Sequence, residues 1–267
     1  MGIDDRNRIA FGGEGLERLS ASRVCVVGLG GVGAAAALDL VRAGVGTVVA
    51  VDFDTVQESN LNRLAFGFGE FVGKPKIDAF AELAERIRSG CRVETVGALV
   101  RGDDPGSYLP DACDVWLDCI DTLNAKVNLV AWLLSGGRLF VSSMGTAGRL
   151  APERLRVSSA WDVAGDPLAH RVRQRLRRLG ATGDFTAVWS DEPPIPPASP
   201  DDGSTPGELR DGARVRAVQG SSPFVPQAAG HLMASVAVRM LLGLWTAPSR
   251  SVARSVPRGA RTEGATA

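Results

Sequence analysis

The stretch that decides the fold is residues 23–33, RVCVVGLGGVG. Its first half, Arg23–Val27, is a short β-branched run, and its second half is a glycine-rich loop that fits the pattern GxGxxG. Residues 34–43 then have the composition of a helix, and a second apolar run, Thr47–Val51, ends at Asp52. A strand, a glycine loop, a helix and a second strand make a mononucleotide-binding unit. The stretch therefore predicts an α/β fold.

The alternation of apolar runs and amphipathic segments continues along the chain. Apolar side chains have helical spacing in residues 76–88 and 167–179, and a last helix is predicted from about Gln227. Strands are predicted at residues 93–100, 115–120 and 139–141. This order predicts a doubly wound, mainly parallel, Rossmann-like sheet with helices on both faces.

We expect residues 1–250 to form a single domain. Residues 1–150 are expected to form its nucleotide-binding half, and residues 151–250 to complete the sheet, the dimer contact and the substrate surface. Residues 190–212 are rich in Pro, Asp, Ser and Gly, which favours a mobile loop. Residues 251–267 have no periodicity and are expected to be a disordered tail.

Composition excludes several classes of protein. The chain has 267 residues, of which 45% are hydrophobic, so it can bury a core without disulfides or a structural metal. Its 30 basic and 30 acidic residues cancel, so an RNA contact would need a local basic patch. The four cysteines contain no CxxC pair, which argues against a zinc ribbon. Cys25 and Cys119 lie in apolar strands and are interpreted as core residues.

No apolar segment follows the charged N-terminus, so we predict no secretory signal and a cytoplasmic location. Residues 228–245 are strongly apolar, but His231 and Arg239 interrupt them. We therefore expect a buried helix there and no contact with a membrane.

The four loop glycines and the carboxylate after the second strand predict a nucleotide site. Glycines let backbone N–H groups approach phosphate oxygens, and Asp52 stands where such folds bind ribose hydroxyls. The pattern is shared by NAD, FAD and ATP sites, so a dehydrogenase is the alternative on this motif alone. The glycines are Gly28, Gly30, Gly31 and Gly33.

The residues after Asp52 argue against hydride transfer. Asn60, Arg63 and Lys76 add an amide and two cations, which suit the charge that develops when a triphosphate is cleaved. Asp121 follows a buried strand and suits Mg²⁺, which is often held by one carboxylate and phosphate oxygens. The alternative for Asp121 is that it caps the following helix.

These motifs, GLGGVG, DFDTVQESNLNR, GKPK and CIDT, resemble in order and spacing the superfamily of ubiquitin-activating-like adenylating enzymes. The resemblance implies ATP as substrate, with Gly31 near its phosphates, Asp52 on its ribose and Asp121 on Mg²⁺. It also implies that Asn60, Arg63 and Lys76 contact the triphosphate. Arg8, in RNRIAFGG, resembles an arginine that reaches into the neighbouring subunit's ATP site, with Arg6 as the alternative, and this implies a homodimer.

Within this superfamily, the chain most resembles the tRNA threonylcarbamoyladenosine dehydratases. The resemblance lies in RIAFGGEGLERL, DPLAHRVRQRLR, AVWSDEPP and GSSPFVPQAAG. It implies adenylation of the carboxylate of N6-threonylcarbamoyladenosine, beside the tRNA anticodon, followed by ring closure. Two alternatives are activation of the C-terminal glycine of a ubiquitin-like sulfur-carrier protein and ATP sensing without turnover. A cysteine desulfurase or sulfur acceptor is a further partner that the resemblance suggests.

Thioester or persulfide chemistry in the second half is not expected, because no cysteine follows Cys119. Arginines instead crowd the predicted helix 167–179, and two more precede it. We interpret them as a face that binds tRNA phosphates, with a solvated helix face as the alternative. They are Arg154, Arg156, Arg171, Arg173, Arg175, Arg177 and Arg178.

Overall fold

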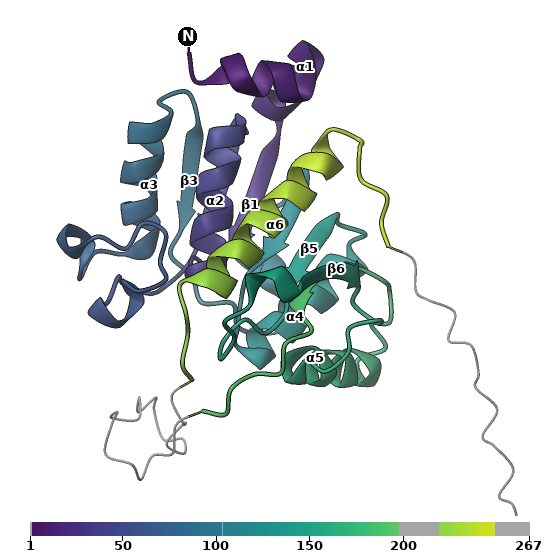
Figure 1. The fold of residues 1–267 in the computed structure, drawn as a ribbon. Coiled ribbons are helices and arrows are strands. Elements are labelled where there is room, and N and C mark those ends of the chain that lie inside the picture. The colour runs from purple at the N-terminus through teal and green to yellow at the C-terminus, as the bar shows by residue number, and fades with distance from the viewer. Residues whose placement is uncertain (1, 103, 198–218, 249–267) are drawn as a thin grey trace, which may run out of the picture.

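The computed structural model describes residues 2–102, 104–197 and 219–248. The strands in this part of the chain are β1 (Arg23–Val27), β2 (Thr47–Val51), β3 (Arg92–Val96), β4 (Val115–Asp118), β5 (Phe140–Ser143), β6 (Leu155–Ser159) and β7 (Thr186–Ser190). They form one sheet in the order β3-β2-β1-β4-β5-β7-β6 (Figure 1). All neighbours pair in parallel except β6 and β7. The predicted mainly parallel sheet is confirmed.

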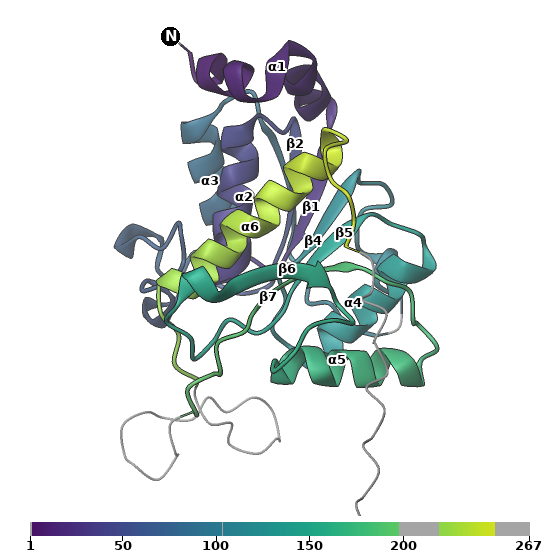
Figure 2. The ribbon, with the colours of Figure 1, turned by 45° about the vertical axis from the view of Figure 1, so that its right-hand side comes forward.

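Helices cover both faces of the sheet, and each face has its own apolar core. The helices are α1 (Asp4–Ala21), α2 (Gly31–Ala43), α3 (Lys76–Ile87), α4 (Leu123–Ser135), α5 (Pro167–Arg178) and α6 (Phe224–Leu241). The core on one face is formed with α2, α3 and α6, and the core on the other with α4 and α5 (Figure 2). Successive residues of β1 alternate between the two cores, as the period of a strand requires. None of the described helices has both the length and the apolar character needed to span a membrane.

Sequence patterns do not predict α1, β6 or β7. The buried residues of α1 are Gly15, Leu16 and Leu19, and the helix is kinked at Gly12, whose φ is 76°. So short an apolar stripe gives little periodicity to detect. β6 and β7 pair with each other at one edge of the sheet, and such pairing depends on distant residues.

Several predicted boundaries need correction, among them the ends of the strands expected at residues 115–120 and 139–141, which end at Asp118 and Ser143. The strand expected at residues 93–100 ends at Val96, and the last helix begins at Phe224 instead of Gln227. The loop expected at residues 190–212 begins later, because Ser190 belongs to β7. The rest of this loop from residue 198, and the expected tail at 251–267, lie outside the described residues.

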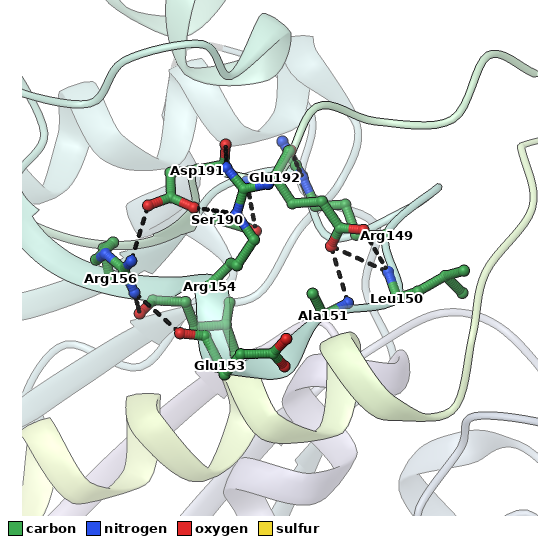
Figure 3. A network of polar contacts seen from close by, with 10 residues as sticks. Arg149, Leu150, Ala151, Glu153, Arg154, Arg156, Ser190, Asp191 and Glu192 are labelled. Carbon is green, nitrogen blue, oxygen red and sulfur yellow. Dashed lines mark hydrogen bonds and ion pairs between the residues drawn. The ribbon is translucent and has the colours of Figure 1, made fainter.

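Glu192 holds the first part of that predicted loop in place. Its carboxylate accepts hydrogen bonds from the N–H groups of Leu150, at 3.0 Å, and Ala151, at 2.9 Å (Figure 3). The bond from Ala151 is the main cause that lowers the pKa of Glu192 below its usual value. The polar side chains of this segment therefore make hydrogen bonds within the protein as well as with solvent.

A buried ion pair joins β4, α4 and β5. Lys126 Nζ lies 2.6 Å from Asp118 Oδ2 and 3.2 Å from Ser142 Oγ, and this hydroxyl donates to the same carboxylate oxygen at 2.6 Å. All three residues are fully buried. Such charges are tolerated only where partners compensate for their lost hydration. The group therefore fixes the beginning of α4 against the end of β4.

Replacing Lys126 with Met should lower the free energy of unfolding by about 3–5 kcal/mol, because Asp118 would remain buried without a cation. Urea titration followed by circular dichroism measures the loss. The double variant Asp118→Asn, Lys126→Met removes both charges and should recover part of it. Equal losses in the single and double variants would contradict the ion pair.

Candidate active site

The predicted nucleotide residues gather where the strand order reverses. β2 and β3 lie on one side of β1, and β4 and β5 lie on the other. The last residues of β1, β2 and β4 are in register, so the segments that begin at Gly28, Asp52 and Cys119 leave the sheet at one edge. Open α/β sheets bind ligands outside the carboxyl ends of their strands at such a point.

Close backbone contacts shape the glycine loop. Gly28 has a φ of 92°, and a Cβ there would lie 3.1 Å from the carbonyl oxygen of Cys119. A Cβ on Gly33 would lie 1.7 Å from the carbonyl oxygen of Gly28, so a larger residue would displace backbone. A Cβ on Gly30 would meet no atom of the described chain within 4 Å, so this part of the loop faces open space.

The first turn of α2 points toward that open space. Gly30 is its N-cap, and no side chain caps the helix. The first N–H groups of a helix lack partners within the helix and carry its positive dipole end. The loop is therefore suited to bind an anion with backbone atoms alone.

Polar contacts hold Asp52 beside the loop and Lys76 beside Asp54. Asp52 accepts hydrogen bonds from the N–H of Leu29 at 2.6 Å and from the N–H of Asp54 at 2.8 Å. Lys76, which is 7% exposed, lies 3.1 Å from Asp54 Oδ2. The end of β2 and the beginning of α3 thus bring a carboxylate and a cation to the same edge.

Arg63 lies against the glycine loop. A Cβ on Gly31 would lie 3.3 Å from Arg63 Cγ. The Arg63 guanidinium donates to the carbonyl oxygen of Ser59 at 2.8 Å and to Asn62 Oδ1 at 3.0 Å. Asn60 lies next to Arg63, since its carbonyl oxygen accepts from the Arg63 N–H at 3.0 Å, while its side chain accepts from the N–H of Gln57 at 3.3 Å.

Residues at and just before the beginning of α6 support the segment of Arg63. Sequence patterns do not predict these contacts. Gln227 Nε2 donates to the Arg63 carbonyl oxygen at 3.2 Å, and Asn62 Nδ2 donates to the carbonyl oxygen of Ser221 at 2.9 Å. These partners are 164 and 159 residues apart. No local pattern could have revealed them.

Asp121 is exposed at the same edge, three residues beyond β4. The interpretation that it caps α4 is wrong, because Thr122 is the N-cap and no side chain makes a capping bond. Asp121 Oδ1 instead accepts from Thr122 Oγ1 at 3.3 Å. Across the described ranges, no group of three His, Cys, Asp or Glu residues could hold a metal by itself. A cation there would need ligands from the substrate.

Arg8 is not brought to this site within one chain. It is exposed on α1, which precedes the amino end of β1, and Arg6 is exposed on the same helix. Figure 1 shows α1 at the end of the molecule away from the loops that follow the strands. A role for Arg8 therefore requires a second chain.

Three arginines of the predicted phosphate-binding face form contacts within the protein. Arg154 and Arg156 pair with Asp191 at 2.6 and 2.9 Å, and this contact holds the pKa of Asp191 below its usual value (Figure 3). Arg173 is half-buried and donates to three backbone carbonyl oxygens, of which the nearest, on Val163, is 2.6 Å away. Arg173, predicted as part of the phosphate-binding face, is therefore held by backbone carbonyl groups of its own chain.

Cys119, the cysteine that contacts the glycine loop, has an unreactive thiol. Burial raises the pKa of the Cys119 thiol far above its usual value, and the neighbouring Asp118 carboxylate raises it further. Burial also raises the pKa of Cys25 and of Cys91. In Cys113, a hydrogen bond from Cys25 and the charge of Arg23 lower the pKa. The thiolate is the nucleophilic form, so Cys119 is not an activated nucleophile.

A family model agrees with this geometry. The model of the ThiF family matches residues 5–256. The chain belongs to the ThiF family. The tRNA threonylcarbamoyladenosine dehydratase of Bacillus subtilis (strain 168) is 32% identical to this ThiF-family protein over 240 residues, which are 89% of this chain and 93% of the relative. The molybdopterin-synthase adenylyltransferase of Escherichia coli (strain K12) is 37% identical over 121 residues, which are 45% of this chain and 48% of the relative.

Solved structures of E. coli tRNA N6-threonylcarbamoyladenosine dehydratase are similar to this protein over nearly their whole length. The complex with AMP gives a TM-score of 0.78 at 27% identity and covers 91% of this chain and 98% of that chain. The complex with ATP gives a TM-score of 0.77 at 26% identity, with the same coverage. This ThiF-family protein is therefore homologous to these dehydratases over most of its chain, whereas the molybdopterin-synthase match is partial.

Thiol labelling checks the pKa order of the cysteines. At pH 8 the native protein should react with Ellman's reagent first at Cys113, because its lowered pKa gives a larger thiolate fraction, and this fast phase should fade as the pH falls. The variant Cys113→Ser should lack the fast phase. Rapid labelling of Cys119 in the native protein would contradict the buried, neutral thiol.

Proposed function

We propose that this ThiF-family protein is an ATP-dependent tRNA threonylcarbamoyladenosine dehydratase. The observation that carries the proposal is the site at the reversal of strand order, where an open glycine loop, a fixed carboxylate and two cations share one edge of the sheet. Homology to the dehydratases over most of the chain supports tRNA as the second substrate.

In this proposal the glycine loop holds ATP by its phosphates. The space at Gly30 leaves room for phosphate oxygens, and the first turn of α2 donates N–H groups to them. Asp52 accepts from ribose hydroxyls, since a carboxylate has more acceptor sites than its two backbone bonds use. Arg63 and Lys76, with Asn60 beside them, stabilise the charge that develops on pyrophosphate as it leaves.

Mg²⁺ fits the same edge through Asp121. This exposed carboxylate alone does not make a cage, which suits an ion held by one carboxylate, waters and phosphate oxygens. When bound, Mg²⁺ would neutralise phosphate charge. The side chain of Asp121 would hold the ion.

The proposed chemistry activates a carboxylate. An oxygen of the threonylcarbamoyl carboxylate attacks the α-phosphorus of ATP, and the bond to pyrophosphate breaks. The carbamoyl group of the same nucleoside then attacks the acyl carbon, and AMP leaves with the former carboxylate oxygen while a proton is lost. Because this second step is intramolecular, proximity replaces an enzyme nucleophile. A neutral Cys119 agrees with that scheme.

We further propose that the protein acts as a homodimer in which Arg8 enters the partner's site. Its exposure on α1, away from the carboxyl edge of its own sheet, supports a contribution between chains. A symmetric dimer would exchange the two arginines reciprocally. The guanidinium would add a third cation beside the phosphates.

Exchange of labelled pyrophosphate into ATP tests the proposed reaction. tRNA bearing threonylcarbamoyladenosine should stimulate exchange. Arg63→Ala and Asp121→Ala should each lower the rate about 10²–10³-fold with an unchanged melting temperature, because each removes charge stabilisation from the transition state. The matched control is Arg86→Ala, an exposed arginine on α3.

The other outcomes of this assay would contradict the proposal. Stimulation only by a small sulfur-carrier protein would favour the second candidate function, which the partial match to a molybdopterin-synthase adenylyltransferase supports. ATP binding without exchange would favour a sensor. Normal turnover by either variant would refute that residue's role.

Mixing inactive variants tests the shared site. Arg8→Ala and Asp121→Ala chains, unfolded and refolded together in equal amounts, should regain about a quarter of wild-type activity, because half of the dimers would contain one intact site of two. A mixture of Arg6→Ala and Asp121→Ala chains tests whether Arg6, the alternative to Arg8, acts across the interface. Absence of any recovery with Arg8→Ala, in a confirmed mixed dimer, would exclude its action across the interface.

A further inference from the structure

Three exposed apolar side chains extend from one junction near the beginning of α6. Leu150, Ile195 and Phe224 are 56%, 54% and 59% exposed. They belong to the loop after β5, to the segment after β7 and to the first residue of α6. The N–H of Ile195 donates to the carbonyl oxygen of Gly148 at 2.7 Å, and the N–H of Gly148 donates to that of Gly220 at 2.8 Å. We call the three side chains the apolar junction.

Buried contacts fix the backbone under the apolar junction. A Cβ on Gly148, whose φ is 68°, would lie 2.8 Å from the carbonyl oxygen of Ile195. Arg149 is fully buried and donates from Nε to the carbonyl oxygen of Glu192 at 2.9 Å. Ser222 Oγ donates to the carbonyl oxygen of Arg149 at 2.8 Å. The exposed side chains therefore stand on a backbone that needs little further ordering to bind a ligand.

The apolar junction lies at the margin of the candidate active site. Phe224 is the first residue of α6, and two residues later Pro226 Cβ would lie 2.9 Å from a Cβ on Gly31. Gln227, in the same turn, donates to the carbonyl oxygen of Arg63. Figure 2 shows the beginning of α6 beside the beginning of α2. Phe224 is thus close in the chain to the residues that contact the glycine loop and Arg63.

The size of the apolar junction limits what can cover it. Single exposed apolar residues are ordinary on protein surfaces, but these three come from distant segments and adjoin a site. A stable contact with a second copy takes roughly 20–30 residues from each chain, so three side chains do not make one alone. They match a small, flat apolar ligand. Unpaired bases of an RNA loop have that shape and stack on aromatic side chains.

We propose that the apolar junction holds an unpaired base of the tRNA next to the modified nucleoside, with the Phe224 ring stacked on it and Leu150 and Ile195 at its edges. The inference rests on the proposed function and adds which side chains contact the RNA. In that function the carboxylate of the nucleoside reaches the ATP held by the glycine loop, so the neighbouring bases remain at its margin. A stacked base there would fix the approach of the carboxylate.

The test measures tRNA binding by three variants of the full-length protein. Phe224→Ala removes the ring, and Phe224→Trp keeps an aromatic face. Leu139→Ala is the matched control, because this side chain is 48% exposed but stands immediately before β5, at the amino end of that strand. Fluorescence anisotropy between 50 and 200 mM salt uses full-length tRNA with threonylcarbamoyladenosine. Two further tRNAs lack the base on the 5′ or on the 3′ side of this nucleoside.

Phe224→Ala should bind the complete tRNA about tenfold more weakly with an unchanged salt slope, because stacking releases no counterions. Phe224→Trp and Leu139→Ala should bind within about twofold of the wild type. Removing the stacked base should weaken binding to the wild type about tenfold and add no further loss in Phe224→Ala, as a shared contact requires. ATP affinity, melting temperature and oligomeric state should not change.

Three outcomes would overturn the inference while leaving the proposed function intact. Equal tRNA affinity of Phe224→Ala and the wild type is the first. Unchanged tRNA affinity with a dissociated dimer, seen by sedimentation, would show that a second copy covers the ring. Unchanged tRNA affinity with a lower melting temperature would show that another segment of the same chain covers it. A wild type that neither binds nor converts this tRNA would overturn both the inference and the proposed function.

Discussion

α2 packs so closely on its neighbours that three glycines around it have no room for a methyl group. A Cβ on Gly33 would lie 1.7 Å from the backbone of Gly28, and one on Gly230 of α6 would lie 2.3 Å from the Val32 carbonyl oxygen. A Cβ on Gly31 would lie 2.9 Å from Pro226 Cβ. This constraint holds the beginning of α2 between the end of β1 and the beginning of α6. The donors of the helix therefore stand at the reversal of strand order.

The charged groups near the candidate active site differ in how deeply they are buried. Under the site, the pairs Lys126–Asp118 and Arg149–Asp166 are fully buried and join loops to strands and helices. Above them, Lys76 and Arg63 lie at the carboxyl edge, and further out Arg171, Arg175 and Arg178 of α5 are exposed. The carboxyl edge therefore carries both carboxylates, such as Asp52 and Asp121, and cations. Cations that are not buried in pairs can bind anions, which nucleotides and RNA both are.

The β1–loop–α2–β2 unit could be predicted because its signals are local. Strand runs, glycines and Asp52 stand within about thirty residues, and each has a direct physical reason. The structure places Asp52 and Arg63 against the loop and Lys76 beside Asp54, and their roles with ATP stay predictions. The partners of Arg63 on α6 could not be predicted, since they are distant in sequence. The contacts of Arg173 could not be predicted either, because the carbonyl groups that bind it belong to an irregular loop before its helix.

The central claim is that this site joins the carboxylate of its substrate to AMP. The most direct measurement uses tRNA whose threonylcarbamoyl carboxylate carries ¹⁸O on both oxygens, with mass spectrometry of the AMP formed in a single turnover. Attack by the carboxylate predicts that each AMP contains one ¹⁸O, taken from the substrate. AMP without ¹⁸O would contradict carboxylate adenylation, whatever the product on the tRNA.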